Sequence, residues 1–563
     1  MKKETNNKIN QRSFYFQDYT HNGVTETKNK KFNVGQDRVY LLFFVFFCLI
    51  FIFSTKIFFI SLKNFDSKNY LKNYTVFKPL RNDILDRNGD PIARNIPVHH
   101  VAIKPNLIKD KKKFLIKLKI LYPKLNFLSV ENNLKKNKYF YFKKNITQEE
   151  KNKLWSLGEK GLLFETTQTR IYPHKNLFSH VVGQIDLDNN GISGVEKFFD
   201  KNLKNNNESL KLSLDTNLQY LIREELLQAT SIFKAKGAAS VLMDVNSGEV
   251  LSLISLPDYN LNFRQEIKDK NFTNKITKGV FELGSIFKTF TIALAIEDEL
   301  FSPNTIVQNI PNKIECSKFT ISEHDEMPSS LSLKEILIRS SNIGTIKVAR
   351  KIGENNLKTF LEDLNLMNTI NFELDEVGSP LSFLWNKCKL ETVSYGHGIT
   401  TTPLQAAAAY ASISNGGIVV NPTLIKNKNS NLEKIRVVND KTSKNINAIL
   451  REVVTNRHGT ASLAEVDGYH VGGKTGTANK NIDGEYTNKK LTSFISVFPT
   501  SEPKYILLVL MDEPRPAPQL TYNYRGKKIS GISRNESGWN SAYVTGKIIE
   551  KIGPILAINK NDF

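Results

Sequence analysis

A chain of 563 residues is longer than one hydrophobic core usually organises, so we expect at least two domains. Apolar residues make up 40% of the chain, which is typical of a folded protein. The formal net charge of +22 raises the question of nucleic-acid binding. However, the lysines are scattered, often beside asparagine, and form no basic run interleaved with aromatic residues. A solvated lysine-rich surface is the favoured interpretation, and nucleic acid is not an expected partner.

The chain has three cysteines, which are too few for a disulfide framework. Cys48 lies in an apolar run, where it behaves as a small hydrophobe. Cys316 and Cys388 could pair, although the sequence alone does not show whether they do. No Cys/His spacing resembles a zinc site, and we expect no metal and no cofactor.

Residues 39–62 form an apolar run with only four polar interruptions, long enough to cross the ~30 Å hydrocarbon core of a bilayer. A cleaved signal peptide is the rival interpretation, but the run is long and no small-x-small cleavage site follows it. We therefore expect an uncleaved single-pass anchor, preceded by a disordered cytoplasmic tail at residues 1–38. Residues 1–38 carry eight basic and four acidic side chains, and residues 63–81 carry five and one. Because both flanks have a net charge of +4, the charge bias does not orient the anchor.

After the anchor, the patterns predict an α+β module without a chemical motif. Ile84–Ala93 has two short apolar arms around an Asn-Gly dipeptide, which indicates a tight hairpin. Residues 106–165 are typical of a Lys-rich α/β module, and a Gly-punctuated stretch covers residues 180–199. We expect residues 63–208 to form a non-catalytic pedestal.

Residues 209–563 are predicted to form one α/β domain. Leu210–Ala229 indicates a strand leading into an amphipathic helix, and Ala238–Ser255 indicates a hairpin turning at Asn246–Gly248. Tyr505–Glu513 is a strong signal for a buried strand. Strands at both ends with helices between them predict a sheet that joins distant parts of the chain.

The segment Phe281–Glu299 opens a helical pattern with Gly284 just before Ser285. On a helix that begins there, Ser285 and Lys288 share one face, so the hydroxyl and the amine can touch. A serine hydroxyl is a poor nucleophile until a base removes its proton, and a lysine can be that base when its neutral form is accessible. This requires a lowered pKa, which burial or a second cation would supply.

Two later segments offer matching chemistry. Ser340-Ser341-Asn342 lies between helical patterns and supplies a hydroxyl for proton relay and an amide for positioning. Lys474-Thr475-Gly476-Thr477 lies in a Gly-rich strand. Glycine there lets a substrate backbone approach and pair with the strand edge, while Lys474 supplies the second cation.

Each element alone is a weak signal. A helix cap, a loop hydroxyl and a surface charge would explain the three separately. The S-x-x-K pattern also occurs twice elsewhere, at Ser231/Lys234 and Ser501/Lys504. The order is specific, because Ser340 follows Ser285 by 55 residues and Lys474 follows Ser340 by a further 134. This ordered set is typical of penicillin-binding proteins and serine β-lactamases.

From the end of the anchor onward, the chain resembles the class B penicillin-binding proteins. Residues 392–417 are more similar to the corresponding segment of division-specific transpeptidases than to that of elongation-specific ones. Residues 63–208 are too short for a glycosyltransferase domain, which favours class B over bifunctional class A. Asn82 replaces a glycine that is usual in the non-catalytic module. The segments similar to that module are Arg81–Ala93, Arg170–Gln184 and Gly191–Asp200.

The resemblance implies an α/β transpeptidase fold of the penicillin-binding and β-lactamase type, with a mixed sheet flanked by helices. An N-terminal transmembrane helix and an elongated α+β pedestal would precede it. By similarity, Ser285 would be the acyl-forming nucleophile and Lys288 its base. Ser340 and Asn342 would relay a proton and position the substrate.

The third motif would bind the substrate. By similarity, Lys474, Thr475 and Thr477, with Gly476 between them, would hold the carboxylate and the stem peptide. The amide N–H groups of Ser285 and Thr477 would form the oxyanion hole.

The function expected from the resemblance is a peptidoglycan D,D-transpeptidase of cell division, inhibited by β-lactams. Expected partners are stem peptides, the lipid-linked precursor, the membrane, a polytopic glycan polymerase and other divisome proteins. We expect the catalytic domain on the outer side of the cytoplasmic membrane, because the substrate lies there.

Three alternatives stay open. The first is an elongation-specific transpeptidase. The second is a D,D-carboxypeptidase or a β-lactamase-type hydrolase, whose E-x-x-L-N pattern is approached only by Leu361–Asn365, with the glutamate one position out. The third is a non-enzymatic scaffold or antibiotic sensor, which should carry further membrane spans or a signalling domain.

Overall fold

The computed structural model describes residues 36–62, 80–205, 208–263, 270–317, 319–427, 434–482 and 484–560. Its contacts define two compact units, Met1–Lys78 and Pro79–Phe563. The tail predicted at residues 1–38 lies outside the described residues as far as residue 35. The boundary predicted after residue 208 lies within the second unit and stays a prediction.

Helix α1 (Gln36–Leu62) is the described part of the first unit. Its large apolar side chains are exposed along its length, and the Thr55 hydroxyl donates to backbone carbonyls one turn earlier. Among the described residues, Asp37–Phe59 is the one helix long and apolar enough to cross a membrane, with a mean hydropathy of 2.5. The apolar run predicted as an anchor is therefore helical over its length.

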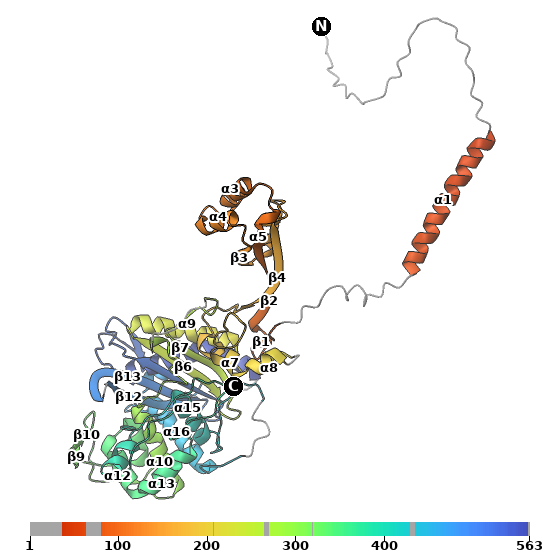
Figure 1. Ribbon diagram of the computed structural model, residues 1–563. Helices are drawn as coiled ribbons and strands as arrows, with labels where there is room; N and C mark the ends of the chain where they lie inside the picture. Colours follow the sequence, from red (N-terminus) through yellow and green to blue (C-terminus); the bar gives the residue numbers. More distant parts are fainter. Residues whose placement is uncertain are drawn as a thin grey trace, which may run out of the picture. The chain divides into compact units, whose positions relative to one another are not determined.

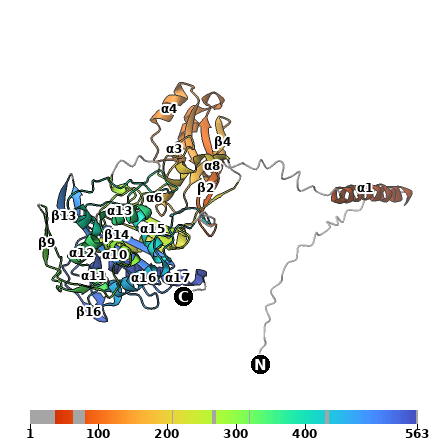
Figure 2. The ribbon, with the colours of Figure 1, turned by 90° about the horizontal axis from the view of Figure 1, so that it is seen from below.

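The second unit begins with the predicted hairpin, in which Ile84 pairs with Ala93 and Gly89 turns the chain at φ +99°. Glycine adopts this left-handed conformation without steric cost. Strand β2 continues as a long arm that pairs with β3 and β4, and β5 pairs parallel with β1 (Figures 1 and 2). The strands are β1 (Ile84–Leu85), β2 (Pro91–Ile103), β3 (Phe140–Ile146), β4 (Leu162–Ile171) and β5 (Leu210–Lys211).

The module predicted at residues 106–165 has a small core of its own at the far end of this arm. Three helices pack on β2, β3 and β4 through apolar side chains that include Phe114, Leu118 and Leu154. The helices of the arm and its base are α3 (Lys111–Leu121), α4 (Leu128–Lys135), α5 (Gln148–Trp155), α6 (Ser179–Val182), α7 (Gly194–Phe198) and α8 (Asp200–Asn205).

A buried ion cluster joins the three pedestal segments that carry the family resemblance. Arg81, fully buried, donates to Glu196 and, at 2.6 Å, to Asp200. Arg170 donates to the other carboxylate oxygen of Glu196 at 2.7 Å. A buried carboxylate between two guanidinium groups is compensated, whereas loss of one partner would leave a buried charge unpaired.

The catalytic part is built on a five-stranded sheet in the order β12-β13-β14-β6-β7, with every pair antiparallel. The predicted hairpin is β6–β7, which turns through Gly248 at φ +73°, and the predicted buried strand is β14. Because β14 lies between β13 and β6, the sheet joins distant parts of the chain as expected. The strands are β6 (Gly237–Asp244), β7 (Val250–Leu256), β12 (Gly472–Ile482), β13 (Glu485–Phe498) and β14 (Tyr505–Asp512).

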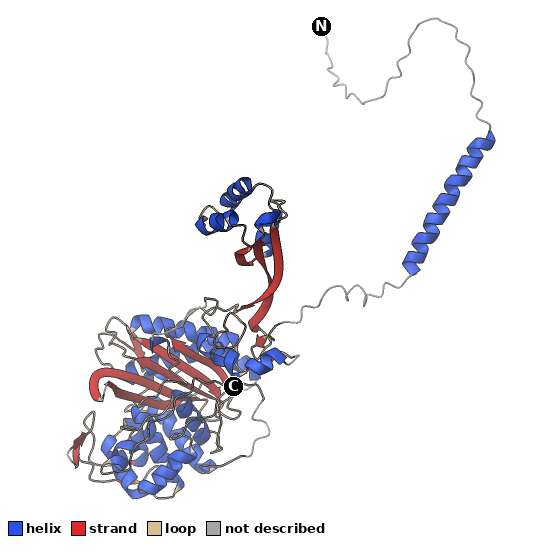
Figure 3. Ribbon diagram, in the orientation of Figure 1, coloured by secondary structure: helices blue, strands red, loops and turns tan. Residues whose placement is uncertain are grey.

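Helices cover both faces of this sheet (Figures 1 and 3). Helices α9 and α17 lie on one face, and α15 and α16 lie on the other. Strands β6, β7 and β14 are therefore buried along their whole length and consist mostly of apolar residues. The helices are α9 (Thr216–Ile232), α10 (Lys288–Glu297), α11 (Leu333–Arg339), α12 (Asn342–Ile352), α13 (Glu354–Asp363), α14 (Lys389–Ser394), α15 (Pro403–Ser414), α16 (Asp440–Thr455) and α17 (Ser541–Lys560).

Short strands form three further pairings. β8 pairs with β11, β9 with β10, and β15 with β16. Their bounds are β8 (Ile306–Val307), β9 (Lys313–Cys316), β10 (Phe319–Ser322), β11 (Leu331–Ser332), β15 (Tyr522–Tyr524) and β16 (Lys527–Ile529).

Candidate active site

Ser285 lies in a 3₁₀ turn, Gly284–Phe287, and helix α10 begins at Lys288. The prediction of a helix beginning at Ser285 is therefore corrected, because one tight turn precedes the helix. Gly284 enters this turn at φ +61°, and a Cβ atom there would lie 2.8 Å from the carbonyl oxygen of Thr477. In a 3₁₀ turn, side chains three residues apart stand above one another, so Ser285 still lies over Lys288.

The Lys288 side chain is fully buried and turns toward the Ser340-Ser341-Asn342 motif. Its amine donates to the Ser340 hydroxyl at 3.0 Å and to the Asn342 side-chain carbonyl at 2.7 Å. Burial lowers the pKa of Lys288 to about 7, against a smaller opposing effect of Glu323. The Ser285 hydroxyl makes no hydrogen bond with any residue that the structure describes, so contact between Ser285 and Lys288 stays a prediction. Such contacts often form only once substrate is bound.

Ser340 joins the two lysines of the site. It ends α11 in the left-handed conformation at φ +61°. Its hydroxyl accepts from Lys288 at 3.0 Å and from Lys474 at 2.9 Å. The hydroxyl therefore lies on a possible proton path between two amines.

Lys474 places a second amine beside Lys288, as the sequence predicted. Its side chain is fully buried, and its amine also donates to the Thr475 carbonyl at 3.1 Å. Burial, together with the charge of Lys288, lowers the pKa of Lys474 well below its ordinary value. Because the two amines share one buried hydroxyl, a positive charge on Lys288 disfavours one on Lys474.

Strand β12 is the edge strand of the sheet, which leaves one side of its backbone open for pairing. Gly476 lies where the strand crosses the nucleophile turn, and a Cβ atom there would lie 2.2 Å from the Leu283 carbonyl oxygen. Only glycine permits this approach. The Thr477 hydroxyl oxygen accepts from the Ser537 amide at 3.2 Å, and the Thr475 hydroxyl contacts Thr460 at 2.8 Å.

Sequence reasoning missed Glu323, which follows strand β10. Its carboxylate accepts from the Ser341 hydroxyl, from the Asn342 amide at 2.7 Å and from the Ile343 amide at 2.9 Å. A carboxylate at this position satisfies the open N–H groups at the start of α12. The Ser322 carbonyl accepts from the Asn342 side-chain amide at 3.0 Å. The hairpin β9–β10 thus orients the second motif.

A disulfide holds this hairpin in place. Cys316, at the end of β9, is bonded to Cys388, which precedes α14, with their Cα atoms 5.7 Å apart. The pairing that the sequence left open is therefore formed. Cys48 is the free cysteine, on α1.

The predicted residues surround one cleft of about 680 Å³. Ser285, Ser340, Asn342, Thr475 and Thr477 line it. Lys288 and Lys474 are fully buried and do not line the cleft, but both contact Ser340, which does. The structure thus brings the three motifs together from three separate segments.

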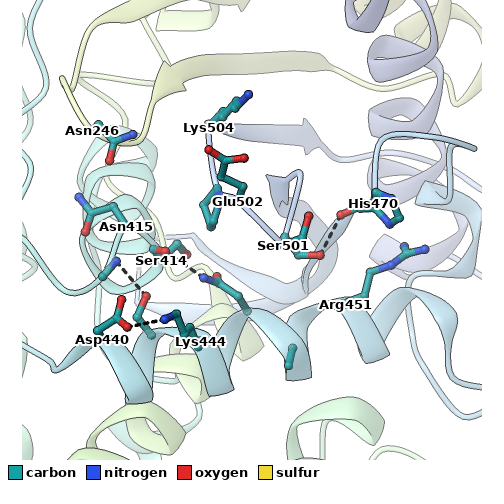
Figure 4. Close-up of a pocket in the computed structure, with 16 residues that line it drawn as sticks. Asn246, Ser414, Asn415, Asp440, Lys444, Arg451, His470, Ser501, Glu502 and Lys504 are labelled. Carbon is teal, nitrogen blue, oxygen red and sulfur yellow. Dashed lines mark hydrogen bonds and ion pairs between the residues drawn. The ribbon is translucent and has the colours of Figure 1, made fainter. Parts of the chain in front are cut away.

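A second polar cavity, of about 870 Å³, lies between α15, α16 and the loop after β13 (Figure 4). Ser501 and Lys504, a repeat of the S-x-x-K pattern, both line it. They lie on a loop with Pro503 between them, and the Lys504 amine is turned away from Ser501 (Figure 4). Lys444 is paired with Asp440 at 2.6 Å. This cavity contains none of the predicted catalytic residues.

Comparison with known proteins agrees with this fold. The model of the penicillin binding protein transpeptidase domain matches residues 238–534, and that of the penicillin-binding protein dimerisation domain matches residues 77–226. The probable peptidoglycan D,D-transpeptidase FtsI of Caulobacter vibrioides is 29% identical over 496 residues, covering 85% of this chain and 82% of the relative. The peptidoglycan D,D-transpeptidase FtsI of Buchnera aphidicola subsp. Schizaphis graminum is 30% identical over 474 residues, covering 77% and 82%.

Among solved structures, penicillin binding protein 3 from Mycobacterium tuberculosis, complexed with aztreonam, matches with a TM-score of 0.64 at 22% identity. The match covers 86% of this chain and 97% of that chain and shows the fold. A dimerisation domain followed by a transpeptidase domain defines a class of penicillin-binding serine transpeptidases. This chain belongs to that family, the class B penicillin-binding proteins. The predicted fold class is thereby confirmed, with the difference that the strand pairs of the catalytic sheet are all antiparallel and the sheet is not mixed.

Proposed function

We propose that this protein is a peptidoglycan D,D-transpeptidase that cross-links stem peptides during cell division. The observation that carries the proposal is the Ser340 hydroxyl, which joins the buried amines of Lys288 and Lys474 beside Ser285. A base that loses its proton near neutral pH and a second cation meet the two needs of a serine nucleophile. The names of the FtsI relatives support the substrate and the division role.

In the acylation step, Lys288 takes the proton of the Ser285 hydroxyl. The Ser285 oxygen attacks the carbonyl carbon between the two terminal D-alanines, with the amide N–H groups of Ser285 and Thr477 as oxyanion donors. The carbon–nitrogen bond then breaks, and the leaving nitrogen receives the proton from Lys288 through the Ser340 hydroxyl. Free D-alanine departs and an ester on Ser285 remains.

In the transfer step, an amine of a neighbouring stem attacks the ester carbon. The amine proton passes to Lys288, the ester carbon–oxygen bond breaks, and Ser285 recovers its proton. A new peptide cross-link forms, and no atom is gained from solvent.

Substrate binding falls to the third motif. Lys474, with the hydroxyls of Thr475 and Thr477, would hold the terminal carboxylate. The arriving carboxylate favours the charged form of Lys474, which couples substrate binding to protonation of that amine. The stem backbone would pair with the open edge of β12. The space beside Gly476 is taken by the Leu283 carbonyl oxygen, so this glycine lets the nucleophile turn approach the strand, rather than the substrate as the sequence suggested.

We infer that the catalytic domain lies outside the cytoplasm and that α1 anchors it in the inner membrane. The disulfide between Cys316 and Cys388 supports this orientation, because disulfides persist in oxidising compartments. A polytopic glycan polymerase, other divisome proteins and the lipid-linked precursor are the proposed partners. Copurification of the polymerase with tagged full-length protein tests the first of these partnerships.

The lifetime of the penicillin adduct tests the reaction class. A transpeptidase should keep the labelled adduct for many minutes, because no residue is expected to activate water at the ester. Rapid release of the label would instead favour a carboxypeptidase or a β-lactamase. Growth of a depletion strain on Ser285→Ala would favour the non-enzymatic scaffold.

The cellular role needs a separate measurement. A fluorescent fusion should gather at the division septum, whereas an even distribution along the side wall would favour the elongation-specific role.

A further inference from the structure

The direction of the donor stem along β12 follows from the proposed function, on which this inference rests. With the terminal carboxylate at Lys474 and Thr475 and the scissile carbonyl at Thr477, the earlier stem residues extend toward Asn479. A strand advances about 3.3 Å per residue, so the residue before the two D-alanines lies near Asn479. We therefore looked for side chains that line this end of the cleft.

Glu282 lies at this end of the cleft, three residues before Ser285. The turn that follows Glu282 packs closely against Gly396, where a Cβ atom would lie 1.9 Å from the Gly284 carbonyl oxygen. His397 is thereby placed over Glu282. Tyr486, on β13, approaches from the third side, and its neighbour on β12 is Asn481.

Three groups hold the Glu282 carboxylate in position. The Tyr486 hydroxyl donates to it at 2.7 Å, His397 Nδ1 lies 3.4 Å from its other oxygen, and the Gly398 amide also donates. Burial alone would raise the pKa of Glu282, but these hydrogen bonds hold it below its ordinary value. The imidazole of His397 stacks between the rings of Tyr395 and Tyr486. The carboxylate is therefore ionised and held in one orientation, with the rings of His397 and Tyr486 beside it.

Glu282 differs in its ion-pair partners from Asp325 and Glu536, two other carboxylates that line the described cleft. Asp325 and Glu536 both lie within ion-pair distance of Arg534. The charge of Glu282 acts to raise the pKa of Lys389. The Lys389 amine, however, donates to the Gly398 carbonyl and lies 3.8 Å from the centroid of the Phe383 ring. Among the described residues, no lysine or arginine forms an ion pair with Glu282. A partly buried carboxylate without a lysine or arginine partner is suited to receive an ammonium group from a ligand.

We propose that Glu282, with His397 and Tyr486, forms a subsite for the ammonium group of the donor stem. The group recognised is the side-chain amine of a diamino acid placed directly before the two D-alanines. The carboxylate accepts hydrogen bonds from the ammonium, and the aromatic walls shield it from water and add cation–π attraction. Glu282 is thus a specificity residue for the donor, separate from the bond-breaking groups.

Paired stem peptides test the subsite. Pentapeptides that end in D-Ala-D-Ala carry either lysine or norleucine at the third position, which differ only in the ammonium group. With the enzyme in excess, the rate of D-alanine release by full-length protein in detergent gives the second-order rate constant of acylation, kcat/KM, for each stem. The wild type should prefer the lysine stem by about 10- to 100-fold, because a hydrogen bond to a charged group contributes that much.

The variant Glu282→Gln should bring this preference to about one, since the amide keeps the shape and loses the charge. Asp325→Asn is the matched control, because it removes the same charge from the same cleft and should keep the preference. Acylation of Glu282→Gln by labelled penicillin should persist, which shows that the variant folds. Equal use of the two stems by the wild type, or an unchanged preference in Glu282→Gln, would overturn the subsite. Loss of penicillin labelling in the wild type would instead overturn the proposed function.

Discussion

Removal of the Cys316–Cys388 disulfide should destabilise the active site as well as the fold. The bond closes a loop across 72 positions, which in the chain-entropy account stabilises the folded state by about 4 kcal/mol. Apart from the disulfide, the hairpin β9–β10 packs on α12 through a small cluster around Ile321 and Ile346. The hairpin also carries Glu323. We therefore expect the double variant Cys316→Ala/Cys388→Ala to lose both stability and the alignment of the second motif.

Two measurements on full-length protein in detergent test this. The urea midpoint, followed by tryptophan fluorescence, should fall, and the rate of acylation by fluorescent penicillin should drop by about tenfold, since a misplaced positioning group costs that much or more. Cys48→Ala is the control and should behave as the wild type, because Cys48 lies on α1 outside the bond. Alkylation without reductant should modify one cysteine of the wild type.

Either of two results would refute the reasoning about this bond. The first is an unchanged midpoint together with an unchanged acylation rate in the double variant. The second is alkylation of three cysteines in the native protein, which would mean that the bond is not formed.

Three further predictions follow from the same geometry. Because burial lowers the pKa of Lys288 to about 7, the neutral base is lost below that pH. Penicillin acylation should therefore fall by about tenfold per pH unit on the acid side and level off above pH 7. A rate that does not change between about pH 5.5 and 8 would contradict this. Glu323→Gln should slow acylation by about tenfold, because the start of α12 at Asn342 loses a charged hydrogen-bond acceptor. The unfolding midpoint should change little. Glu196→Gln should destabilise the pedestal by about 3–5 kcal/mol, because Arg170 is then buried without its charge partner, although Arg81 keeps Asp200. Unfolding of the wild type and variant at equal detergent concentration measures the difference.

Much of the catalytic fold could be predicted because its signals are local. Residues 505–511 are an uninterrupted apolar run, and the turn at Gly248 needs a positive φ, so strand and hairpin follow from a few neighbouring residues. The order of the three motifs predicted which residues share the cleft. It did not predict that Lys288 turns to Ser340, because that depends on packing between distant segments.

The remaining features depend on contacts that no local pattern reveals. The turn at Ser285 is 3₁₀ rather than α-helical, and its first residue, Gly284, packs against Thr477, almost two hundred positions later. Glu323 lies among other acidic residues of one loop, and nothing in that run marks it as the one that reaches Asn342. The ion pair of Arg81 with Glu196 also joins residues far apart in sequence. Such pairings are set by the tertiary fold.

The central claim is that Ser285 is the nucleophile, and mapping the penicillin adduct tests it most directly. Full-length protein is labelled, digested and analysed by mass spectrometry, with Ser285→Ala treated in parallel. The account predicts one modified peptide, with the added mass on Ser285, and no adduct in the variant. An adduct on another residue of the wild type, or a stable adduct on Ser285→Ala, would contradict it.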